Sequence, residues 1–433
     1  MNLKLGVIAD DFTGATDIAS FMAQAGWQVI QLNGRADDVR LPDDTDAVVI
    51  SLKTRSCPAG QAVAESLEAL AWLDAHQCRR VYFKYCSTFD STAKGNIGPV
   101  TDALLQATGR SMAVLCPALP VNHRQVIGGN LLVNGVALNE SGMQHHPLTP
   151  MTDAYLPRVM DAQSEGKTGL IPLATVRQGG QAVAQRLDQL RQQGVRYALA
   201  DIEHDSDLAL LAAALPAEIL LTGGSGLGGA IALAQGAARR VKTERLPSAT
   251  GRAVILSGSC SAMTNRQVAR YQQADLSQST PTDNGTTTAA WCRPIEAARC
   301  LTEAHRYAAE LVEWVISQPG DPAPLLYATQ SAQAVGAIQA RHGAAVIGQA
   351  IEQLFADIAC QLQNLGFNKF IIAGGETSSL VAQQLGVKGF TIGQTIAPGV
   401  PWVKDIQRPL WLALKSGNFG QENFFNQAQE HYQ

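Results

Sequence analysis

The fold class is decided near the amino terminus by the segment LKLGVIADDFTGATD, residues 3–17. Residues 3–9 form a short apolar run, rich in Leu, Val and Ile, in which polar and apolar positions do not strictly alternate. Such runs are typical of buried strands in parallel sheets. Thr13 and Thr16 are suited to cap a helix. The segment therefore predicts a strand that turns directly into a helix, with Asp10 and Asp11 at the turn.

The same pattern recurs along the first half of the chain. Amphipathic segments, such as 61–76 and 181–193, separate the apolar runs. This alternation of strand and helix predicts an open, mostly parallel sheet with helices on both faces. The further apolar runs are 28–32, 46–51, 81–85, 112–117, 169–174, 197–202 and 219–221.

A second α/β series follows the polar stretch 244–251, which contains Pro and Gly and is our candidate linker. The series has predicted strands at 253–257, 369–373, 390–392 and 410–414, and long helices at 296–316 and 345–365. We therefore predict two open, mostly parallel α/β domains, at residues 1–245 and 246–433. We also expect an active-site cleft between them, because small ligands favour domain interfaces and the carboxyl ends of parallel strands.

The composition excludes several classes of protein. With 46% hydrophobic and 16% charged residues the chain is not disordered, and a net charge of -4 provides no basic field for nucleic acid or an anionic membrane. The eight cysteines contain no C-x-x-C pair, which indicates reduced thiols. Without a signal peptide or a long apolar span, we expect a cytoplasmic protein. Its charge-poor, Ala- and Gln-rich helices are compatible with a homodimer.

Two of the predicted strands end in charged side chains that suit a small acidic ligand. Asp10 and Asp11 could bind hydroxyl groups, take a proton from one, or contact a metal. The alternative is a helix cap in which one acid is paired in a salt bridge. Arg55, in KTRS at 53–56, could hold a carboxylate through two parallel hydrogen bonds, and its alternative is a solvated loop.

The strand at 81–85 runs into a loop that is dense in hydrogen-bond donors, residues 84–98. Two lysines and four Ser and Thr hydroxyl groups could surround an anion. The alternative is a hydroxyl-rich turn that caps a helix at 99–107. We also considered His123 as a base or an anion contact, although a lone histidine is more often structural. The pair His145 and His146 lacks further ligands at a spacing that would indicate zinc.

The sequence TGGSGLGG at 222–229 formally contains G-x-G-x-x-G at Gly224, Gly226 and Gly229. This pattern raises an NAD-dependent hydroxy-acid dehydrogenase as one rival function. The dinucleotide motif, however, belongs in the first strand–helix unit, with an acid at the end of the next strand. We therefore interpret it as a turn that opens a helix. A second rival is a non-catalytic protein whose two lobes bind a ligand.

Three strand ends of the second domain are rich in glycine and hydroxyl side chains. They are LSGSCS at 256–261, AGGETSS at 373–379 and LKSGNFG at 414–420. Unpaired backbone N–H groups at helix starts bind phosphate oxygens, so three such loops in one domain favour a nucleotide site. The chain contains neither a P-loop motif nor protein-kinase signatures.

Taken in order, these segments resemble the four-carbon acid-sugar kinase family along essentially the whole length of the chain. The matching segments are ADDFTGATD at 9–17, KTRS at 53–56, FKYCSTFDSTAKGNIGP at 83–99, TGGSGL at 222–227, LSGSCS at 256–261, AGGETS at 373–378 and KSGNFG at 415–420. Within the family, the loop YCSTFDSTAKGNIG is similar to the 3-oxo-tetronate kinases. Threonate- and erythronate-type members place Arg where this chain has Lys94.

The resemblance implies a sugar-acid-binding first domain and an ATP-binding second domain. The implied reaction is ATP-dependent phosphorylation of the 4-hydroxyl of a tetronate, with Mg²⁺ at the β- and γ-phosphates. We predict catalytic roles for Asp10 and Asp11. The predicted sugar-acid contacts are Arg55, Lys84, Ser87, Thr88, Lys94 and Asn96, and the predicted ATP contacts are Ser257, Ser259, Gly374, Gly375, Glu376, Thr377 and Gly417.

Overall fold

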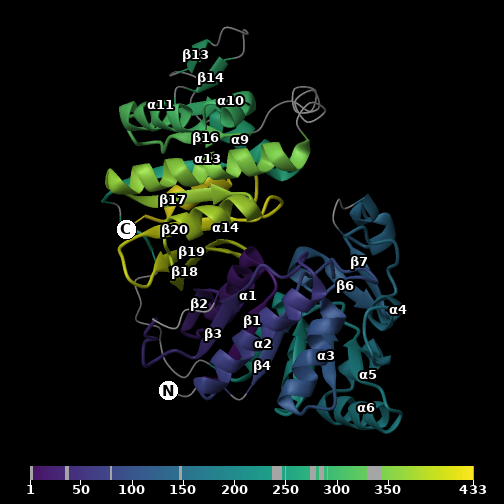
Figure 1. Cartoon of the computed structure of the whole chain (residues 1–433). Helices are drawn as coiled ribbons and strands as arrows, with labels where there is room; N and C mark the ends of the chain where they lie inside the picture. The colour runs from purple at the N-terminus through teal and green to yellow at the C-terminus, as the bar shows by residue number, and fades with distance from the viewer. Residues whose placement is uncertain are drawn as a thin grey trace. The chain divides into compact units, whose positions relative to one another are not determined.

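The computed structural model describes residues 3–34, 39–78, 80–145, 149–236, 246–248, 250–273, 279–281, 287–289, 291–328 and 343–432. The chain divides into two compact units, Met1–Lys242 and Thr243–Gln433 (Figure 1). In the candidate linker at 244–251, residues 244, 245 and 249 lie outside the described residues, as do residues 282–286 of the polar segment at 280–288 and His146. Within the described residues, no helix is both long and apolar enough to cross a bilayer.

The first unit is built on a parallel sheet with the strand order β2-β3-β1-β4-β11-β5-β10-β9. All eight predicted strands are confirmed, with ends shifted by at most three residues. Their bounds are β1 Leu5–Ala9, β2 Val29–Asn33, β3 Ala47–Ser51, β4 Val81–Lys84, β5 Ala113–Cys116, β9 Thr168–Ile171, β10 Tyr197–Ala200 and β11 Leu220–Gly223. The strands are buried almost throughout, which explains their continuous apolar runs.

The helices of this unit pack in two groups. Helix α2 (Ala59–Ala75) packs on α3 (Ile97–Thr108) (Figure 1). On the other side, α1 (Phe12–Gln24), α8 (Ser225–Ala234), α7 (Asp205–Ala214) and α6 (Gly180–Gln192) pack in a row. The chain moves from β1 to β2 in one direction and from β3 to β4 in the other. Because such crossovers are right-handed, α1 and α2 cover opposite faces of the sheet. Two short helices, α4 (Leu156–Asp161) and α5 (Leu173–Arg177), complete the set.

A small antiparallel sheet in the first unit was not predicted. It consists of β6 (Arg124–Ile127), β7 (Asn130–Val133) and β8 (Val136–Ala137), and follows the 3-10 turn η1 (Pro120–Asn122). Two further 3-10 turns follow, η2 (Leu138–Glu140) and η3 (Met143–His145). These strands are short and partly exposed, so they lack the buried apolar runs by which the larger sheet was recognised.

The second unit contains a mixed sheet with the strand order β15-β16-β12-β17-β20-β19-β18. The predicted strands are present as β12 (Arg252–Ser257), β17 (Phe367–Ala373), β18 (Gly389–Ala397) and β20 (Trp411–Lys415). Three strands of this sheet were not predicted: β15 (Cys292–Pro294), β16 (Leu325–Tyr327) and β19 (Val400–Asp405). Because β19 runs antiparallel to both neighbours, the sheet is parallel only in part. A separate pair is formed by β13 (Ser279–Pro281) and β14 (Thr287–Ala289).

One helix prediction in this unit was wrong. The single helix predicted at 296–316 is two helices, α10 (Ala297–Thr302) and α11 (Ala304–Ser317), because Glu303 leaves the helical region with φ of -146°. The helix predicted at 345–365 is confirmed as α13 (Ala344–Asn364). The remaining helices are α9 (Ala262–Gln272), α14 (Gly375–Gln384) and α15 (Phe424–Glu430).

The end of β11 depends on a glycine, which gives a direct test of the packing. Gly223 has φ of +152°, and a Cβ atom there would lie 2.1 Å from the backbone oxygen of Cys116 on β5. We predict that Gly223→Ala destabilises the first unit by about 3 kcal/mol. Thermal unfolding should then show a Tm lower by roughly 6–12 °C.

The matched control is Gly60→Ala in helix α2. No atom lies within 4 Å of the added Cβ at Gly60, and alanine favours the helix. We expect an unchanged or slightly higher Tm for this variant. Equal Tm values for Gly223→Ala and the wild type would contradict the packing at β11.

Candidate functional site

The strand order brings the predicted charged residues of the first unit together. Strand β1 lies between β3 and β4, with Ala9 paired to Ser51 and to Lys84. The three strands are parallel, so their carboxyl ends meet at one edge of the sheet. The segments that carry Asp10 and Asp11, Arg55, and the loop 84–98 therefore begin side by side.

Arg55 joins the two aspartates. Its Nε and Nη2 atoms donate to Oδ2 and Oδ1 of Asp10 at 3.0 and 2.8 Å, and Nη2 also reaches Oδ1 of Asp11 at 2.5 Å. The backbone supports this arrangement, because the N–H groups of Thr54 and Arg55 donate to the carbonyl oxygen of Asp10 at 2.9 and 3.2 Å. Paired hydrogen bonds of this kind fix the relative orientation of the two groups as well as their distance.

The two aspartates differ in exposure and in the direction in which the pKa of each carboxyl is shifted. Burial raises the pKa of the Asp10 carboxyl, and Arg55 only partly opposes this effect. Burial also favours the neutral form of Asp11, but the positive charges of Arg55 and Lys84 outweigh it and lower the pKa of that carboxyl. The Asp11 side chain is 24% exposed and that of Asp10 only 7%. Asp11 is therefore the ionised carboxylate that a ligand can reach.

Asp11 also begins helix α1. Its Oδ1 accepts from the backbone N–H of Gly14 at 3.1 Å, and its Oδ2 accepts from the Thr13 hydroxyl at 2.8 Å. A Cβ atom at Gly14 would lie 2.2 Å from Asp11 Oδ1 and 3.1 Å from Lys84 Nζ. Gly14 thus leaves the space in which the aspartate and the lysine approach each other. Asp11 thus caps helix α1 and is also paired with Arg55, as the alternative interpretation of the Asp10 and Asp11 pair described.

The loop 84–98 holds its own hydroxyl groups in a network. Lys84 is buried and donates to the carbonyl oxygen of Tyr85 at 2.7 Å. The Thr88 hydroxyl donates to Asp90 Oδ1 at 2.6 Å, and Asp90 Oδ2 lies 4.0 Å from Arg55 Nη1. Ser87 is half-buried and Lys94 is exposed. The network brings Asp90, which the sequence analysis did not single out, to the free edge of the Arg55 guanidinium.

Asn96 and Gln163 fix this loop to its surroundings. The Asn96 amide donates to the carbonyl oxygens of Thr54 at 2.6 Å and Cys57 at 2.8 Å, so it holds the segment that carries Arg55. Gln163 Oε1 accepts from the Ser91 hydroxyl at 2.9 Å and from the Gly98 backbone at 3.0 Å. No local motif marks Gln163, because its contacts join segments far apart in the chain.

The glycine-rich segment at 222–229 serves helix packing. A Cβ atom at Gly228 would lie 2.6 Å from Ile18, and one at Gly229 would lie 3.0 Å from Phe21, so α8 packs closely on α1. At the start of α8, the Ser225 hydroxyl donates to Asp17 Oδ2, and the other oxygen of this buried carboxylate has no hydrogen-bond partner in the described part of the chain. Close packing explains these glycines without a dinucleotide.

The histidine candidate His123 lies in a turn. His123 ends the turn η1 in the left-handed region with φ of 58°, and its side chain is exposed. This agrees with the structural alternative. No cluster of three or more His, Cys, Asp or Glu side chains that could hold a metal occurs within the described residues.

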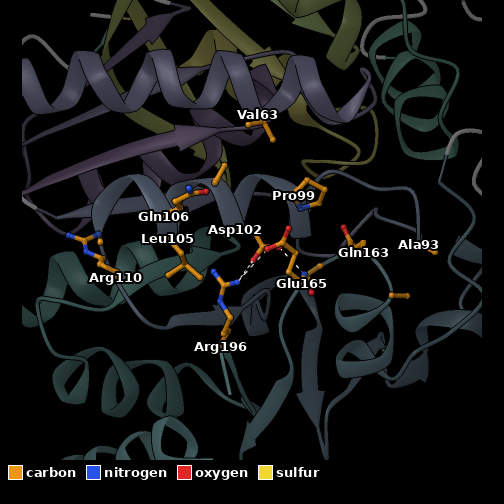
Figure 2. A pocket seen from close by; sticks show the side chains of 14 residues that line it. Val63, Ala93, Pro99, Asp102, Leu105, Gln106, Arg110, Gln163, Glu165 and Arg196 are labelled. Atoms are coloured by element: carbon orange, nitrogen blue, oxygen red, sulfur yellow. Dashed lines mark hydrogen bonds and ion pairs between the residues drawn. The ribbon is translucent and has the colours of Figure 1, made fainter. Parts of the chain in front are cut away.

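A separate pocket of about 950 Å³ lies along α3 (Figure 2). Arg196 pairs there with Asp102 at 3.6 Å, and Gln163 and Ala93 belong to its lining. None of the strand-end charges around Asp10 lines this pocket. It is therefore distinct from the candidate sugar-acid site, and it meets the loop 84–98 through Ala93 and through Gln163, which holds that loop.

In the second unit, the three predicted loops follow the adjacent strands β12, β17 and β20. The N–H groups of Gly258 and Ser259 donate to the carbonyl oxygen of Ala373, and that of Gly374 donates to Lys415 at 2.8 Å. A Cβ atom at Gly258 would lie 2.2 Å from Thr377 Oγ1. The loops therefore form one interlocked group.

Helix α14 starts in this group with unpaired backbone donors. Its N-cap, Gly374, has φ of +126° and provides no side-chain cap. The N–H groups of the first turn, which includes Gly375, Glu376 and Thr377, are therefore available to phosphate oxygens. Gly417 packs against this group, since a Cβ atom there would lie 2.7 Å from Ser259 Oγ. The side chain of Glu376 is exposed.

Comparison with known proteins gives the same division of the chain. Residues 5–231 match the model of a sugar-binding N-terminal domain, and residues 254–425 match that of a nucleotide-binding C-terminal domain. A 3-oxo-tetronate kinase of Pectobacterium atrosepticum is 53% identical over 440 residues, covering 99% of both chains. One of Salmonella typhimurium is 50% identical over 436 residues, covering 100% of both.

A crystal structure of a protein from Salmonella typhimurium LT2 has the same fold. It superposes with a TM-score of 0.88 at 49% identity, over 99% of this chain and 100% of that chain. About half of the residues are thus shared along the whole length, through both family domains. The chain belongs to the 3-oxo-tetronate kinase family.

Proposed function

We propose that this protein is an ATP-dependent kinase that phosphorylates the 4-hydroxyl group of 3-oxo-tetronate, in acid-sugar catabolism. The observation that carries the proposal is the cluster of Asp10, Asp11 and Arg55 at the strand ends of the unit that matches a sugar-binding domain. The interlocked glycine loops occupy the corresponding strand ends of the unit that matches a nucleotide-binding domain.

Within the sugar-acid site, we assign different roles to the two aspartates. Asp11 orients the 4-hydroxyl group and accepts its hydrogen bond, because Asp11 is ionised and partly exposed. Asp10 is buried and holds Arg55. Of the Arg55 guanidinium, only Nη1 remains to meet the substrate, so we expect Lys84, Ser87 and Lys94 to contribute to binding its carboxylate. Thr88 and Asn96 support the loop through the hydrogen bonds described above.

In the nucleotide site, we expect Ser257, Ser259 and Gly417, together with the first turn of α14, to surround the phosphates of ATP. Mg²⁺ neutralises phosphate charge when bound and takes most of its ligands from phosphate oxygens and water. Glu376 is the exposed carboxylate at the start of α14 that could complete this set.

Phosphoryl transfer depends on positioning and on charge neutralisation more than on covalent chemistry. Nucleotide and sugar acid must meet, and water must be excluded because it competes as an acceptor. We therefore expect the active site to lie in a cleft between the domains, which stays a prediction. The domain boundary between residues 245 and 246 and the homodimer also stay predictions. So does the cytoplasmic location.

The first prediction concerns the substrate. In an assay that couples ADP release to a colour change, we expect kcat/KM for 3-oxo-tetronate to exceed that for D-threonate and D-erythronate by at least about tenfold. Higher turnover of D-threonate or D-erythronate would favour the alternative 4-kinase. NAD reduction with these acids would instead indicate the dehydrogenase. A thermal shift without turnover would indicate a binding protein.

The second prediction concerns Asp11. Asp11→Asn should lower kcat at least about 100-fold, because the neutral amide cannot take the proton and accepts only a weaker hydrogen bond from the substrate hydroxyl. Asparagine also caps helices well, so α1 should persist and the KM for ATP should change little. The exposed Asp44→Asn is the matched control, with wild-type kinetics expected. Near-normal kcat in Asp11→Asn would remove the assigned role.

The third prediction concerns Arg55 and has a defined pH dependence. Arg55→Met leaves the buried Asp10 without a partner, at a cost of about 3 kcal/mol at pH 8. The pKa of Asp10 is already raised by burial and should rise further. Since a raised carboxyl pKa reduces stability only above the unfolded-state pKa, protonation at low pH relieves the cost.

The Tm difference between wild type and Arg55→Met should therefore be larger at pH 8 than at pH 5, as measured by differential scanning calorimetry. The control is Arg158→Met, which breaks an exposed pair with Asp153 and should change Tm little at either pH. If Arg55→Met lowers Tm by the same amount at both pH values, Asp10 does not depend on Arg55 for its charge.

A further inference from the structure

The second unit contains a buried lysine whose charge is not matched by an acid. Lys415 is the last residue of β20 and its side chain is fully buried. Its ammonium group donates to Thr264 Oγ1 at 3.0 Å and to the carbonyl oxygens of Ser416 and Gly417 at 3.0 and 2.8 Å. Its donors are thus occupied, but every acceptor is neutral.

No carboxylate pairs with Lys415 among the residues that the structure describes. Burial alone lowers the pKa of its ammonium group to about 7. A buried charge without a countercharge is costly, even when its hydrogen bonds are made. The elements packed around it are β17, β19, α9, α14 and α15. On α9, Arg266 pairs with Glu422 at 3.1 Å. The other titratable or charged groups on these elements are Lys369, Lys404, Asp405, Arg270, Tyr271, Glu376 and Glu430, and the thiol of Cys260 lies just before α9.

Lys415 lies where the three glycine loops meet. Its carbonyl oxygen accepts from the Gly374 N–H. The carbonyl oxygen of Gly417, which accepts from its side chain, also accepts from the hydroxyls of Ser261 at 2.6 Å and Thr264 at 2.7 Å. One residue thereby connects the starts of α9 and α14 with the loop after β20.

Two further polar groups near these loops are without partners. The hydroxyl oxygens of Ser257, at the end of β12, and Ser378, in the first turns of α14, are both buried and have no hydrogen-bond partner in the described part of the chain. Unpaired buried hydroxyls in the same group of loops as a buried cation are the surroundings expected for an anion that is bound only part of the time.

We propose that Lys415 is a positioning residue of the nucleotide site and holds the three glycine loops together. The phosphates of a bound nucleotide supply the countercharge that the chain does not give to Lys415. The inference rests on the proposed nucleotide-binding function and adds to it a specific residue and a specific coupling. Lys415 acts through Gly417 and Thr264 and through its charge, without a need to touch the nucleotide itself.

Binding of a nucleotide should change the protonation of Lys415. Without nucleotide, Lys415 loses its proton as the pH rises through about 7. An anion nearby favours the charged form, so the bound state keeps the proton to higher pH. Nucleotide binding should therefore take up a proton above pH 7, by linkage, with about 0.9 protons per site at pH 8.

The experiment is calorimetric titration of the full chain with ADP at pH 8, without metal, in buffers of different ionisation enthalpy such as Hepes and Tris. At this pH, ADP is fully ionised and contributes no proton change. We expect an uptake of about 0.9 protons in the wild type, and a Kd for ADP that rises about eightfold from pH 7.5 to 8.5. Lys415→Met should show neither effect.

Lys369→Met is the matched control. Lys369 is also a buried lysine of this unit, and it donates to the carbonyl oxygens of Ser248 at 2.9 Å and Thr250 at 3.3 Å. It lies four residues before Ala373 on β17, away from the glycine loops. This variant should keep the wild-type proton uptake and pH dependence.

The outcomes separate the two proposals. If wild-type protein binds ADP without proton uptake, or if Lys415→Met takes up as many protons as wild type, the role of Lys415 is overturned and the kinase proposal stands. If ADP does not bind at all, both are overturned. The wild-type titration decides by itself should Lys415→Met fail to fold, which circular dichroism would reveal.

Discussion

The paired hydrogen bonds from Arg55 to Asp10 hold together the parts of the first unit that form its site. Asp10 is buried at the end of β1, and its charge is tolerable only because a guanidinium group reaches it from the end of β3. The same group contacts Asp11, which begins α1, and faces Asp90 of the loop after β4. A single cation thus sets the relative positions of three strand ends, and leaves Asp11 ionised and reachable.

In the second unit, the strand-end loops and the buried cation are stabilised by different contacts. Its strand ends carry glycines that let three loops approach within a distance that any Cβ atom would prevent. The cation there, Lys415, is surrounded by hydroxyl and carbonyl oxygens in place of carboxylates. In the first unit the countercharge is part of the chain, whereas in the second unit we infer that the ligand brings it. This difference suits one unit to a hydroxyl-bearing acid and the other to phosphate.

Much of the fold could be predicted because buried parallel strands leave a continuous apolar signal. The eight strands of the first unit and four of the second were recognised in this way. Most of the strands that were missed, such as β6, β15 and β16, have four residues or fewer and carry too little pattern, whereas β19 was missed although it has six residues. The break between α10 and α11 at Glu303 was missed because the helical composition continues across it. Local signals fail where an element is short or where a turn lies within a helical composition.

The sequence by itself determined the α/β class, the two-part organisation and the strand-end segments that hold the candidate site, because period and motif are local properties. Only the tertiary structure decided what those side chains do. It placed Arg55 on Asp10, gave Asn96 and Gln163 their roles in holding loops, and turned the glycines at 228 and 229 toward α1. These roles depend on contacts between residues far apart in the chain, and on burial, which sets the charge of each group and cannot be read from its neighbours in sequence.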